Sequence, residues 1–476
     1  MKIFLLTTPW SYYELRNPGV ERSPGLKGYK DVSWQGALPP QGLLQLASVL
    51  RKAGHDIYLM DGYLQDIQKI RQCVLKENPQ IVGISTVTCL WEKTKVLLRE
   101  VRKILSESFL LIGGPHATFS KEKCLEESPE LNAVVVGEGE WSAREIASRL
   151  NSKAGIEGIP GVIFRNGSKI INNSSAGYIQ NLDGLPLPAY DLVNFQNYIP
   201  NVTFLNDMPF MHIFTSRGCS QMCGFCTYSQ KNPLRFKSVN YLIDEIKYLV
   251  ASLGVKTLNF YDDCNIFSYD PEKAYLFCKL LRKMKRKPQW SIYLVNFAIT
   301  KEILREMKGS GCFLINCAIE SGVQENRDRV RGEKFFLEKI AEKVREISKI
   351  GISTCGRFQF GIPGETFKQG LRTIDFACLL PLDYAFFIRA LLNPGSKMFE
   401  AYLKMNRINP DTRTWNAYVE FFQPDRMTLR DVSALIKIGY KRFYRRSNWW
   451  TSRIIRFSRY SLYGKYFKRI MNDQLI

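Results

Sequence analysis

Features that would place a protein in a membrane or outside the cell are missing from this chain. Its 476 residues contain no uninterrupted apolar run of about 18 residues, the length that a spanning helix needs. The opening segment 1–10 is apolar but short. It carries one lysine and no small-residue cleavage site follows it, so we interpret it as a core strand and not as a signal peptide. The hydrophobic content of 45% is ample for two or three packed domains.

The 12 cysteines lack the spacing of a disulfide framework. Most are scattered through apolar runs, where a free thiol packs as a small hydrophobic side chain. Only Cys219, Cys223 and Cys226 are clustered. We therefore expect a reducing, cytoplasmic location.

Acidic residues are absent from the segment 437–469, which contributes much of the basic excess behind the formal charge of +22. Trp450, Ile454 and Phe457 in this segment fall at helical spacing. The segment can be a helix packed on the protein with a solvated cationic face. It can also be a peripheral helix on an anionic membrane surface, or an RNA-binding segment that contacts the phosphates. No RNA-binding domain is recognisable, so we expect no nucleic-acid partner.

Strands and helices alternate through residues 1–150. Apolar strands are expected at 2–6, 56–60, 80–85, 109–112 and 133–136, with helices at 42–53 and 93–105 between them. This pattern predicts an open, doubly wound parallel sheet of Rossmann-like α/β type, in which ligands bind outside the carboxyl ends of the strands. Residues 151–205 are rich in Gly, Pro and Asn, and we interpret them as an ordered linker with short strands.

A second alternating series runs from 206 to 400. Six strands are expected, at 211–216, 256–261, 290–295, 313–319, 353–360 and 384–391, with helices between them. This predicts a partial or full (β/α)6 barrel, followed by a helical basic region over 401–476. In such barrels the chemistry lies at the carboxyl ends of the strands. The residues that stand out at those ends are the cysteine trio, Asp262, Asp263, Glu320, Gly361 and Glu365.

Three thiolates at spacings of four and three can wrap one face of a cubane iron–sulfur cluster. A cubane has four irons, so three cysteines leave one iron open. An open iron can bind and cleave a further molecule, much as catalytic zinc keeps one position free. The alternative is a zinc site whose fourth ligand is His212 or Cys264.

The motif CxxxCxxC after a first barrel strand resembles the radical S-adenosylmethionine superfamily. The resemblance implies a [4Fe–4S] cluster on Cys219, Cys223 and Cys226, with S-adenosylmethionine chelated at the open iron. An external one-electron donor of flavodoxin or ferredoxin type would then drive cleavage to a 5′-deoxyadenosyl radical.

Further positions match the same superfamily. The resemblance places Phe225 beside the adenine, Asp262 and Asp263 near the methionine amino group, Glu320 and Ser321 at the ribose or carboxylate, and the Gly361-Ile362 turn at the adenine. Each residue taken alone is equally compatible with loop packing, a helix cap or a turn. Cys264 departs from the polar residue that many relatives carry, and is either a packing residue or a reactive thiol.

The front part resembles the cobalamin-binding domains of class B radical S-adenosylmethionine methyltransferases. The cofactor-binding residues implied are Ser85, Thr86, Gly113, Gly114, His116, Gly137 and Glu138. The DxHxxG loop of other cobalamin methyltransferases is missing, so no histidine is available there as a lower cobalt ligand. The alternative is a domain that keeps the fold without cobalamin. We expect His55, at a helix–strand turn, to be structural.

We therefore predict a monomeric, cobalamin-dependent enzyme that methylates an unactivated carbon of a small-molecule or lipid-like substrate. The rival enzymes are a radical cyclase, an oxygenating enzyme or a carbon–carbon coupling enzyme. Methyl transfer yields S-adenosylhomocysteine as well as 5′-deoxyadenosine, whereas a cyclase yields no S-adenosylhomocysteine. The rival from another class is a non-catalytic membrane-surface or RNA-binding protein that retains a structural cluster.

Overall fold

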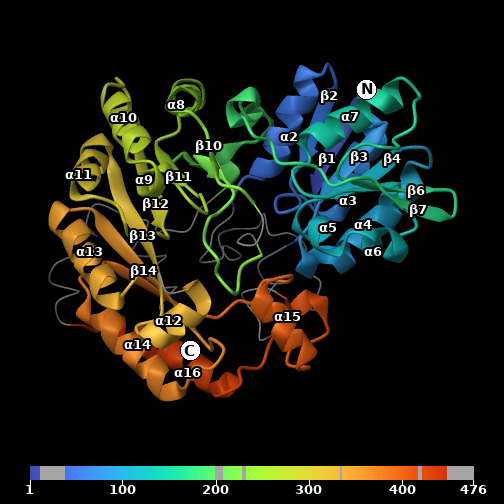
Figure 1. Ribbon diagram of the computed structural model, residues 1–476. Helices are drawn as coiled ribbons and strands as arrows, with labels where there is room; N and C mark the ends of the chain where they lie inside the picture. Colours follow the sequence, from blue (N-terminus) through green and yellow to red (C-terminus); the bar gives the residue numbers. More distant parts are fainter. Residues whose placement is uncertain (11–37, 199–206, 228–231, 333–334, 416–420, 447–476) are drawn as a thin grey trace. The chain divides into compact units, whose positions relative to one another are not determined.

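The computed structural model describes residues 1–10, 38–198, 207–227, 232–332, 335–415 and 421–446 (Figure 1). The chain divides into two compact units. The first holds residues 1–10, 38–198 and 409–415 of the described chain, and the second holds the rest. Among the described residues no helix combines the length and the apolar character needed to cross a bilayer.

The first unit is built on one seven-stranded sheet in the order β2-β1-β3-β4-β5-β6-β7. The first five of these strands pair in parallel, while β6 and β7 are antiparallel additions at one edge. The strands are β1 (Lys2–Thr7), β2 (Asp56–Met60), β3 (Ile81–Ser85), β4 (Phe109–Gly113), β5 (Ala133–Val135), β6 (Val162–Asn166) and β7 (Lys169–Asn172).

Helices cover both faces of this sheet, because its central strands are apolar on both sides. One core cluster packs Phe4 and Val82 under one set of helices, and the other packs Ile3 and Leu111 under a second set. The first set is α3 (Ile67–Glu77), α4 (Trp91–Ile104), α5 (Pro115–Ser120) and α6 (Glu122–Glu127); the second set is α2 (Gln41–Lys52) and α7 (Glu140–Asn151). The doubly wound α/β architecture predicted from the sequence is confirmed.

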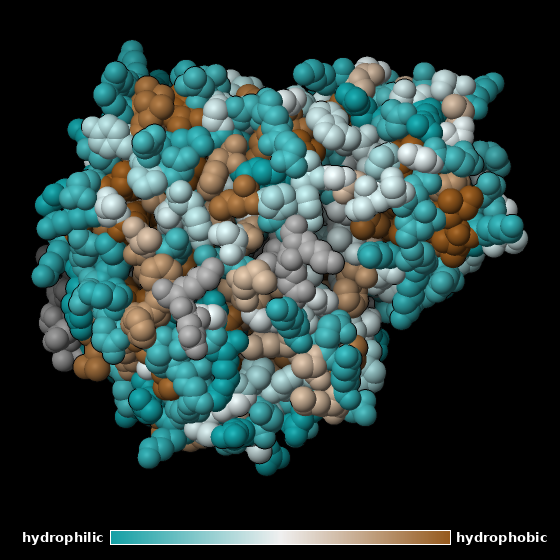
Figure 2. All heavy atoms as spheres, in the orientation of Figure 1, coloured by the Kyte–Doolittle hydropathy of each residue, from teal (hydrophilic) through white to brown (hydrophobic). Residues whose placement is uncertain are grey.

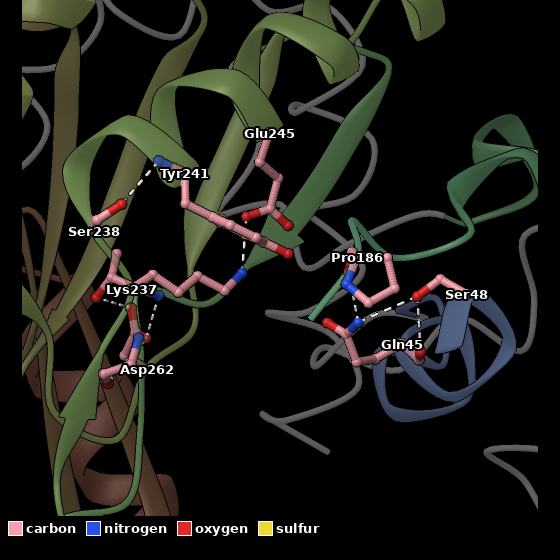
Figure 3. A network of polar contacts seen from close by, with 10 residues as sticks. Gln45, Ser48, Pro186, Lys237, Ser238, Tyr241, Glu245 and Asp262 are labelled. Atoms are coloured by element: carbon pink, nitrogen blue, oxygen red, sulfur yellow. Dashed lines mark hydrogen bonds and ion pairs between the residues drawn. The ribbon is translucent and has the colours of Figure 1, made fainter. Parts of the chain in front are cut away.

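Residues 151–198 belong to the first unit, whereas the sequence predicts a separate linker over 151–205. β6 pairs with β5, so the hairpin extends the sheet. The following segment holds three short turns, η3 (Leu182–Gly184), η4 (Tyr190–Leu192) and η5 (Phe195–Asn197). It is tied to α2, because Gln45 donates a hydrogen bond to the Pro186 carbonyl at 2.8 Å (Figure 3).

The second unit is an open (β/α)6 barrel in the order β8-β11-β12-β13-β14-β15, with every neighbouring pair parallel. No pairing between β15 and β8 occurs in the part of the chain that the structure describes. The strands are β8 (Phe210–Ile213), β11 (Thr257–Phe260), β12 (Gln289–Leu294), β13 (Cys312–Glu320), β14 (Ser353–Phe360) and β15 (Tyr384–Arg389). All six predicted barrel strands are present.

Helices cover the outer face of the barrel sheet. Trp290 lies within an aromatic cluster with Phe260, Phe267 and Phe277, and all four rings are buried. The helices of this unit are α8 (Val239–Leu253), α9 (Ile266–Tyr269), α10 (Pro271–Arg282), α11 (Lys301–Ser310), α12 (Gln324–Arg331), α13 (Leu337–Ile350), α14 (Phe367–Leu379), α15 (Lys397–Lys404) and α16 (Leu429–Tyr444). On the face that Figure 2 shows, hydrophilic residues predominate and apolar patches are separate and small.

Candidate functional site

The loop that carries the three clustered cysteines begins at the carboxyl end of β8. A two-stranded ribbon of β9 (Ser216–Arg217) and β10 (Arg235–Phe236) anchors its start. Gly218 follows with φ +88, and a methyl group on it would lie 2.1 Å from the Pro233 carbonyl oxygen. Only glycine fits this turn.

The middle of the loop is held by two other elements. The Gly224 amide donates to the Val330 carbonyl of α12 at 2.9 Å, and the Gly224 carbonyl accepts from the Met398 amide of α15 at 3.0 Å. The Phe225 carbonyl accepts from the Asn393 amide at 2.9 Å. The cysteine loop is therefore a fixed part of the barrel mouth, as a cluster site requires.

The three thiols fit an iron–sulfur cluster by their chemistry. Cys223 is buried, while Cys219 and Cys226 are partly exposed. Burial raises the pKa of Cys223, and the Arg331 guanidinium, 3.6 Å from its sulfur, lowers it. A cation beside a thiol favours the thiolate, which is the form that binds iron.

Within the described ranges no three His, Cys, Asp or Glu side chains converge as a site for a single metal ion. Each thiolate of a cubane binds a different iron, so a cluster site does not require such convergence. The Cys264 sulfur lies 3.2 Å from that of Cys219. The His212 ring is buried and makes edge contacts with Phe214 and Tyr261.

Asp262 braces the entry to the cysteine loop. Its carboxylate accepts hydrogen bonds from the Thr215 amide at 2.6 Å and the Ser216 amide at 2.8 Å, and from both hydroxyl groups. Burial raises the pKa of Asp262 to about 7. The neighbouring Asp263 is exposed, although the protein around it raises its pKa to about 6 by desolvation. Of the two predicted acids, Asp263 is the one whose carboxylate faces solvent.

An ion pair that the sequence analysis did not identify lies beside this brace. Lys237 contacts Glu245 of α8 at 2.8 Å, and both side chains are buried. Its ammonium group lies 4.9 Å from the centre of the Tyr241 ring. Figure 3 shows Lys237 extending toward Glu245, with Asp262 nearby. The ammonium lowers the pKa of Asp262, against the larger effect of burial.

Glu320 ends β13 in an unusual conformation, with φ +71 at a register irregularity against β14. Its carboxylate accepts hydrogen bonds from Arg331 at 2.5 and 3.1 Å and from Gln359 at 2.5 Å. Arg331 is also the residue that approaches Cys223, so Glu320 is linked to the cysteine loop through one guanidinium. Neither Arg331 nor Gln359 was predicted, since no short spacing connects them to Glu320 in the sequence.

The other predicted strand-end residues are held by buried hydrogen bonds. The Ser321 hydroxyl lies 3.0 Å from that of Thr373. The Glu365 carboxylate accepts the amides of Gly361 at 2.8 Å and Ile362 at 3.3 Å. Burial raises the pKa of Glu365 to about 7. Glu365 therefore shapes the turn from inside and is not itself open to a ligand.

In the first unit the predicted cofactor residues gather at the carboxyl ends of β3, β4 and β5. Gly114 has φ +91, and a methyl group there would lie 2.9 Å from the Ser85 hydroxyl. Next to it the Thr86 hydroxyl lies 2.6 Å from that of Thr94. Gly137, with φ +82, has open space where a side chain would begin. A close approach of backbone to a large planar ligand needs such positions.

His116 is buried at the start of α5 and packs against Trp91, with 4.6 Å between the ring centres and the ring planes tilted by 31°. Burial lowers its pKa to about 4, so its imidazole is neutral at neutral pH. Its Nε2 atom is buried and has no hydrogen-bond partner in the described protein. That orphaned polar atom, together with the open position at Gly137, fits a polar ligand group at the carboxyl ends of these strands. The Glu138 carboxylate instead accepts the Ile179 amide at 2.8 Å.

Two protein families match the chain, in the same order as its units. The B12 binding domain matches residues 32–147, and the radical SAM superfamily matches residues 213–377.

Curated relatives match over most of the chain. An uncharacterised methyltransferase of Pyrococcus horikoshii is 29% identical and covers 86% of this chain and 88% of its own. The cytidylyl-2-hydroxyethylphosphonate methyltransferase of Streptomyces wedmorensis is 26% identical, covering 78% and 79%. An anaerobic magnesium-protoporphyrin IX monomethyl ester cyclase of Cereibacter sphaeroides is 24% identical, covering 86% and 67%.

Among solved structures, the radical S-adenosylmethionine methyltransferase TsrM of Kitasatospora setae, with cobalamin and a [4Fe–4S] cluster bound, has a TM-score of 0.69. It is 16% identical and the match covers 91% of both chains, so it has the same fold.

Proposed function

Because this chain belongs to the radical S-adenosylmethionine superfamily and carries a B12-binding domain ahead of its barrel, we propose that it is a cobalamin-dependent methyltransferase acting on an unactivated carbon. The observation that carries the proposal is the pairing of these two domains in one chain, along which a methyltransferase relative matches over 86% of the length.

The reaction balances with two molecules of S-adenosylmethionine and two electrons. One molecule is cleaved to methionine and a 5′-deoxyadenosyl radical, which takes the substrate hydrogen and becomes 5′-deoxyadenosine. The other gives its methyl group and leaves as S-adenosylhomocysteine. When bound, the cluster supplies the electron for cleavage and cobalamin carries the methyl group. The electrons come from an external one-electron donor of flavodoxin or ferredoxin type.

The chain's own residues hold and orient these groups. Cys219, Cys223 and Cys226 ligate the cluster, and Arg331 fixes Glu320 beside them. For S-adenosylmethionine we assign Phe225, Asp262, Asp263, Glu320, Ser321, Gly361 and Ile362. For cobalamin we assign Ser85, Thr86, Gly113, Gly114, His116, Gly137 and Glu138.

Product analysis tests the proposal. Anaerobically reconstituted protein with hydroxocobalamin, dithionite and S-adenosylmethionine is expected to form both 5′-deoxyadenosine and S-adenosylhomocysteine. Cys223→Ala is expected to lose the brown absorbance of the cluster and the 5′-deoxyadenosine. The matched control is Cys378→Ala, a partly exposed cysteine of α14, which is expected to keep both. A Cys223→Ala protein with full cluster content would contradict the ligand assignment.

A second candidate is a radical cyclase, favoured by the match to the magnesium-protoporphyrin ester cyclase over 86% of the chain. It predicts 5′-deoxyadenosine without S-adenosylhomocysteine. Cluster binding without any cleavage would instead support a non-catalytic protein.

The substrate, in this proposal, is a small-molecule or lipid-like compound, the enzyme is a monomer, and its basic carboxyl-terminal segment contacts anionic membrane peripherally. Most of that segment, from residue 447 on, lies outside the described residues. Sedimentation with vesicles of anionic and of zwitterionic lipid tests the membrane contact. At low salt the protein should sediment with the anionic vesicles and not with the zwitterionic ones.

A further inference from the structure

Arg357 lies on the inner face of the barrel, in the middle of β14. Alternate residues of a strand point to opposite faces. Phe358 and Phe360 stack on Phe387 of β15, which in turn contacts Phe443 of α16, so they face the helices. Arg357 therefore faces the interior that the helices do not cover.

Aromatic rings surround the Arg357 guanidinium. It donates a hydrogen bond to the Tyr293 hydroxyl of β12 at 2.5 Å, and lies 5.1 Å from the centre of that ring. The Phe386 ring of β15 lies 5.3 Å away on another side. Tyr293 makes an edge contact with Tyr261, whose side chain is 42% exposed. One cation is thus held between two rings, close to a third that is open to a ligand.

No carboxylate of the described residues lies within ion-pair distance of Arg357. Arg331, by contrast, is paired with Glu320 at 2.5 Å. A guanidinium taken out of bulk water without a counter-charge is unfavourable, and such groups are normally paired. Arg357 is only partly buried, so the unpaired charge remains reachable from the barrel interior.

Arg357 also lies deeper along β14 than the Gly361-Ile362 turn that we assign to S-adenosylmethionine. Gln359, two residues along, bonds Glu320 at the strand end. Gly361, two residues further, forms the exit turn. At roughly 3.3 Å per strand residue, the Arg357 backbone lies about 7 Å below that of Gln359 and about 13 Å below that of Gly361. A group bound at Arg357 is therefore separated along the strand from a group bound at the Gly361-Ile362 turn.

We propose that Arg357 binds an oxyanion of the substrate, a carboxylate or a phosphate, while an unsaturated or apolar part of the same molecule packs on Tyr261. The guanidinium supplies the charge and a planar pair of donors. Tyr293 and Phe386 fix its orientation. This assignment rests on the proposed function and names the substrate class of that site.

Binding of simple aryl anions tests the proposal without turnover. The cluster-reconstituted full chain is titrated with phenyl phosphate, with benzoate and with uncharged benzyl alcohol, and heats of binding are measured. Wild type is expected to bind at least one of the anions and to bind benzyl alcohol at least tenfold more weakly. Arg357→Met is expected to weaken anion binding at least tenfold, and Arg357→Lys to restore part of it. The control is Arg345→Met, an exposed arginine of α13, which should bind as wild type does.

Two further measurements separate the alternatives. The affinity for S-adenosylmethionine should be unchanged in Arg357→Met; a tenfold loss there, with aryl anion binding intact, assigns Arg357 to the S-adenosylmethionine carboxylate and overturns the proposal. Because Arg357 has no carboxylate partner to leave unpaired, Arg357→Met should keep its denaturation midpoint and cluster content, and a large fall in either would make the arginine structural.

The two proposals fail separately. Loss of aryl anion binding in Arg357→Met, in a protein that never cleaves S-adenosylmethionine, would remove the methyltransferase but leave the anion site. If wild type cleaves S-adenosylmethionine but Arg357→Met binds the aryl anions as tightly as wild type does, the anion site is wrong and the methyltransferase proposal stands.

Discussion

Glu320 is the one residue other than glycine in a described strand whose φ is positive. Such a conformation is unfavourable by about 1–3 kcal/mol and persists only where the surroundings fix it. Here three hydrogen bonds from Arg331 and Gln359 hold the carboxylate in place. The strained residue is also the one that leads, through Arg331, to Cys223.

Replacing Glu320 with Gln should destabilise the protein strongly. The substitution removes the counter-charge of a buried guanidinium, which is unfavourable by about 3–5 kcal/mol. We expect a lower denaturant midpoint for the barrel and a reduced iron content after reconstitution, measured by urea titration and by iron analysis.

The neighbouring ion pair provides the control. Arg329 and Glu325 pair on the exposed side of α12, where an ion pair contributes no more than about 1 kcal/mol. Glu325→Gln should therefore leave both the midpoint and the iron content near those of wild type. Equal effects of the two substitutions would mean that the Glu320–Arg331 pair is not the buried link described above.

Short motifs made some of these residues predictable and left others hidden. The cysteine trio and the acids at strand ends stand at recognisable spacings and follow apolar strands. Lys237, Arg331 and Gln359 act through partners that the fold brings together, and isolated polar residues inside ordinary helices and strands carry no such signal. Asp262 is predicted as a ligand contact, and its hydrogen bonds show a different role, since they fix the start of the cysteine loop.

At the scale of elements, the barrel strands were predictable because each is a compact apolar run between breakers. The helix α12 gave no comparable signal, since it is short and polar, with its buried face made of Asn326, Arg327, Val330 and Arg331. The hairpin of β6 and β7 was visible as short strands, but its addition to the first sheet depends on pairing with β5, far earlier in the chain.

Helices α14 and α16 pack closely at one glycine. A methyl group on Gly370 of α14 would lie 2.4 Å from the Leu435 Cδ1 atom of α16. Gly370→Ala should therefore destabilise the barrel by about 1–3 kcal/mol, although alanine favours helix formation. Leu435→Ala leaves a cavity and should be unfavourable by about 2–5 kcal/mol. The variant with both substitutions should lose less free energy of unfolding than the two single variants lose together, as measured by urea unfolding.

Gly42 of α2 is the opposite case, since its position is exposed and nothing lies within 4 Å of an added methyl group. Gly42→Ala should stabilise the protein by up to about 1 kcal/mol. If Gly370→Ala behaved in the same way, the close approach of α14 and α16 would be contradicted.

For the molecule as a whole, two units with separate cores should respond separately to their cofactors. Hydroxocobalamin at about 100 times its dissociation constant should stabilise the unit that binds it by about 2.7 kcal/mol. Hydrogen exchange is then expected to slow in peptides from β3 to α5, and to stay unchanged in peptides from β12 and β13.

Gly114→Val supplies the control for this experiment. Its φ of +91 and the contact with the Ser85 hydroxyl leave no place for a branched side chain. The variant should retain less corrin after gel filtration and show no slowed exchange. A wild-type chain that retains no corrin would favour a front domain that keeps the fold without cobalamin.

The first unit has one further property, because part of it is encoded after the barrel. Residues 409–415 belong to it, and η8 (Thr412–Thr414) contacts α4 and the turn η2 (Thr88–Leu90) that follows β3. On the ribosome the front sheet can form early, yet this piece emerges only after all six barrel strands have been made. Completion of the first unit is thus postponed until almost the whole polypeptide has been translated. A nascent chain stalled within the barrel carries a front domain in which α4 and the turn after β3 still lack this contact.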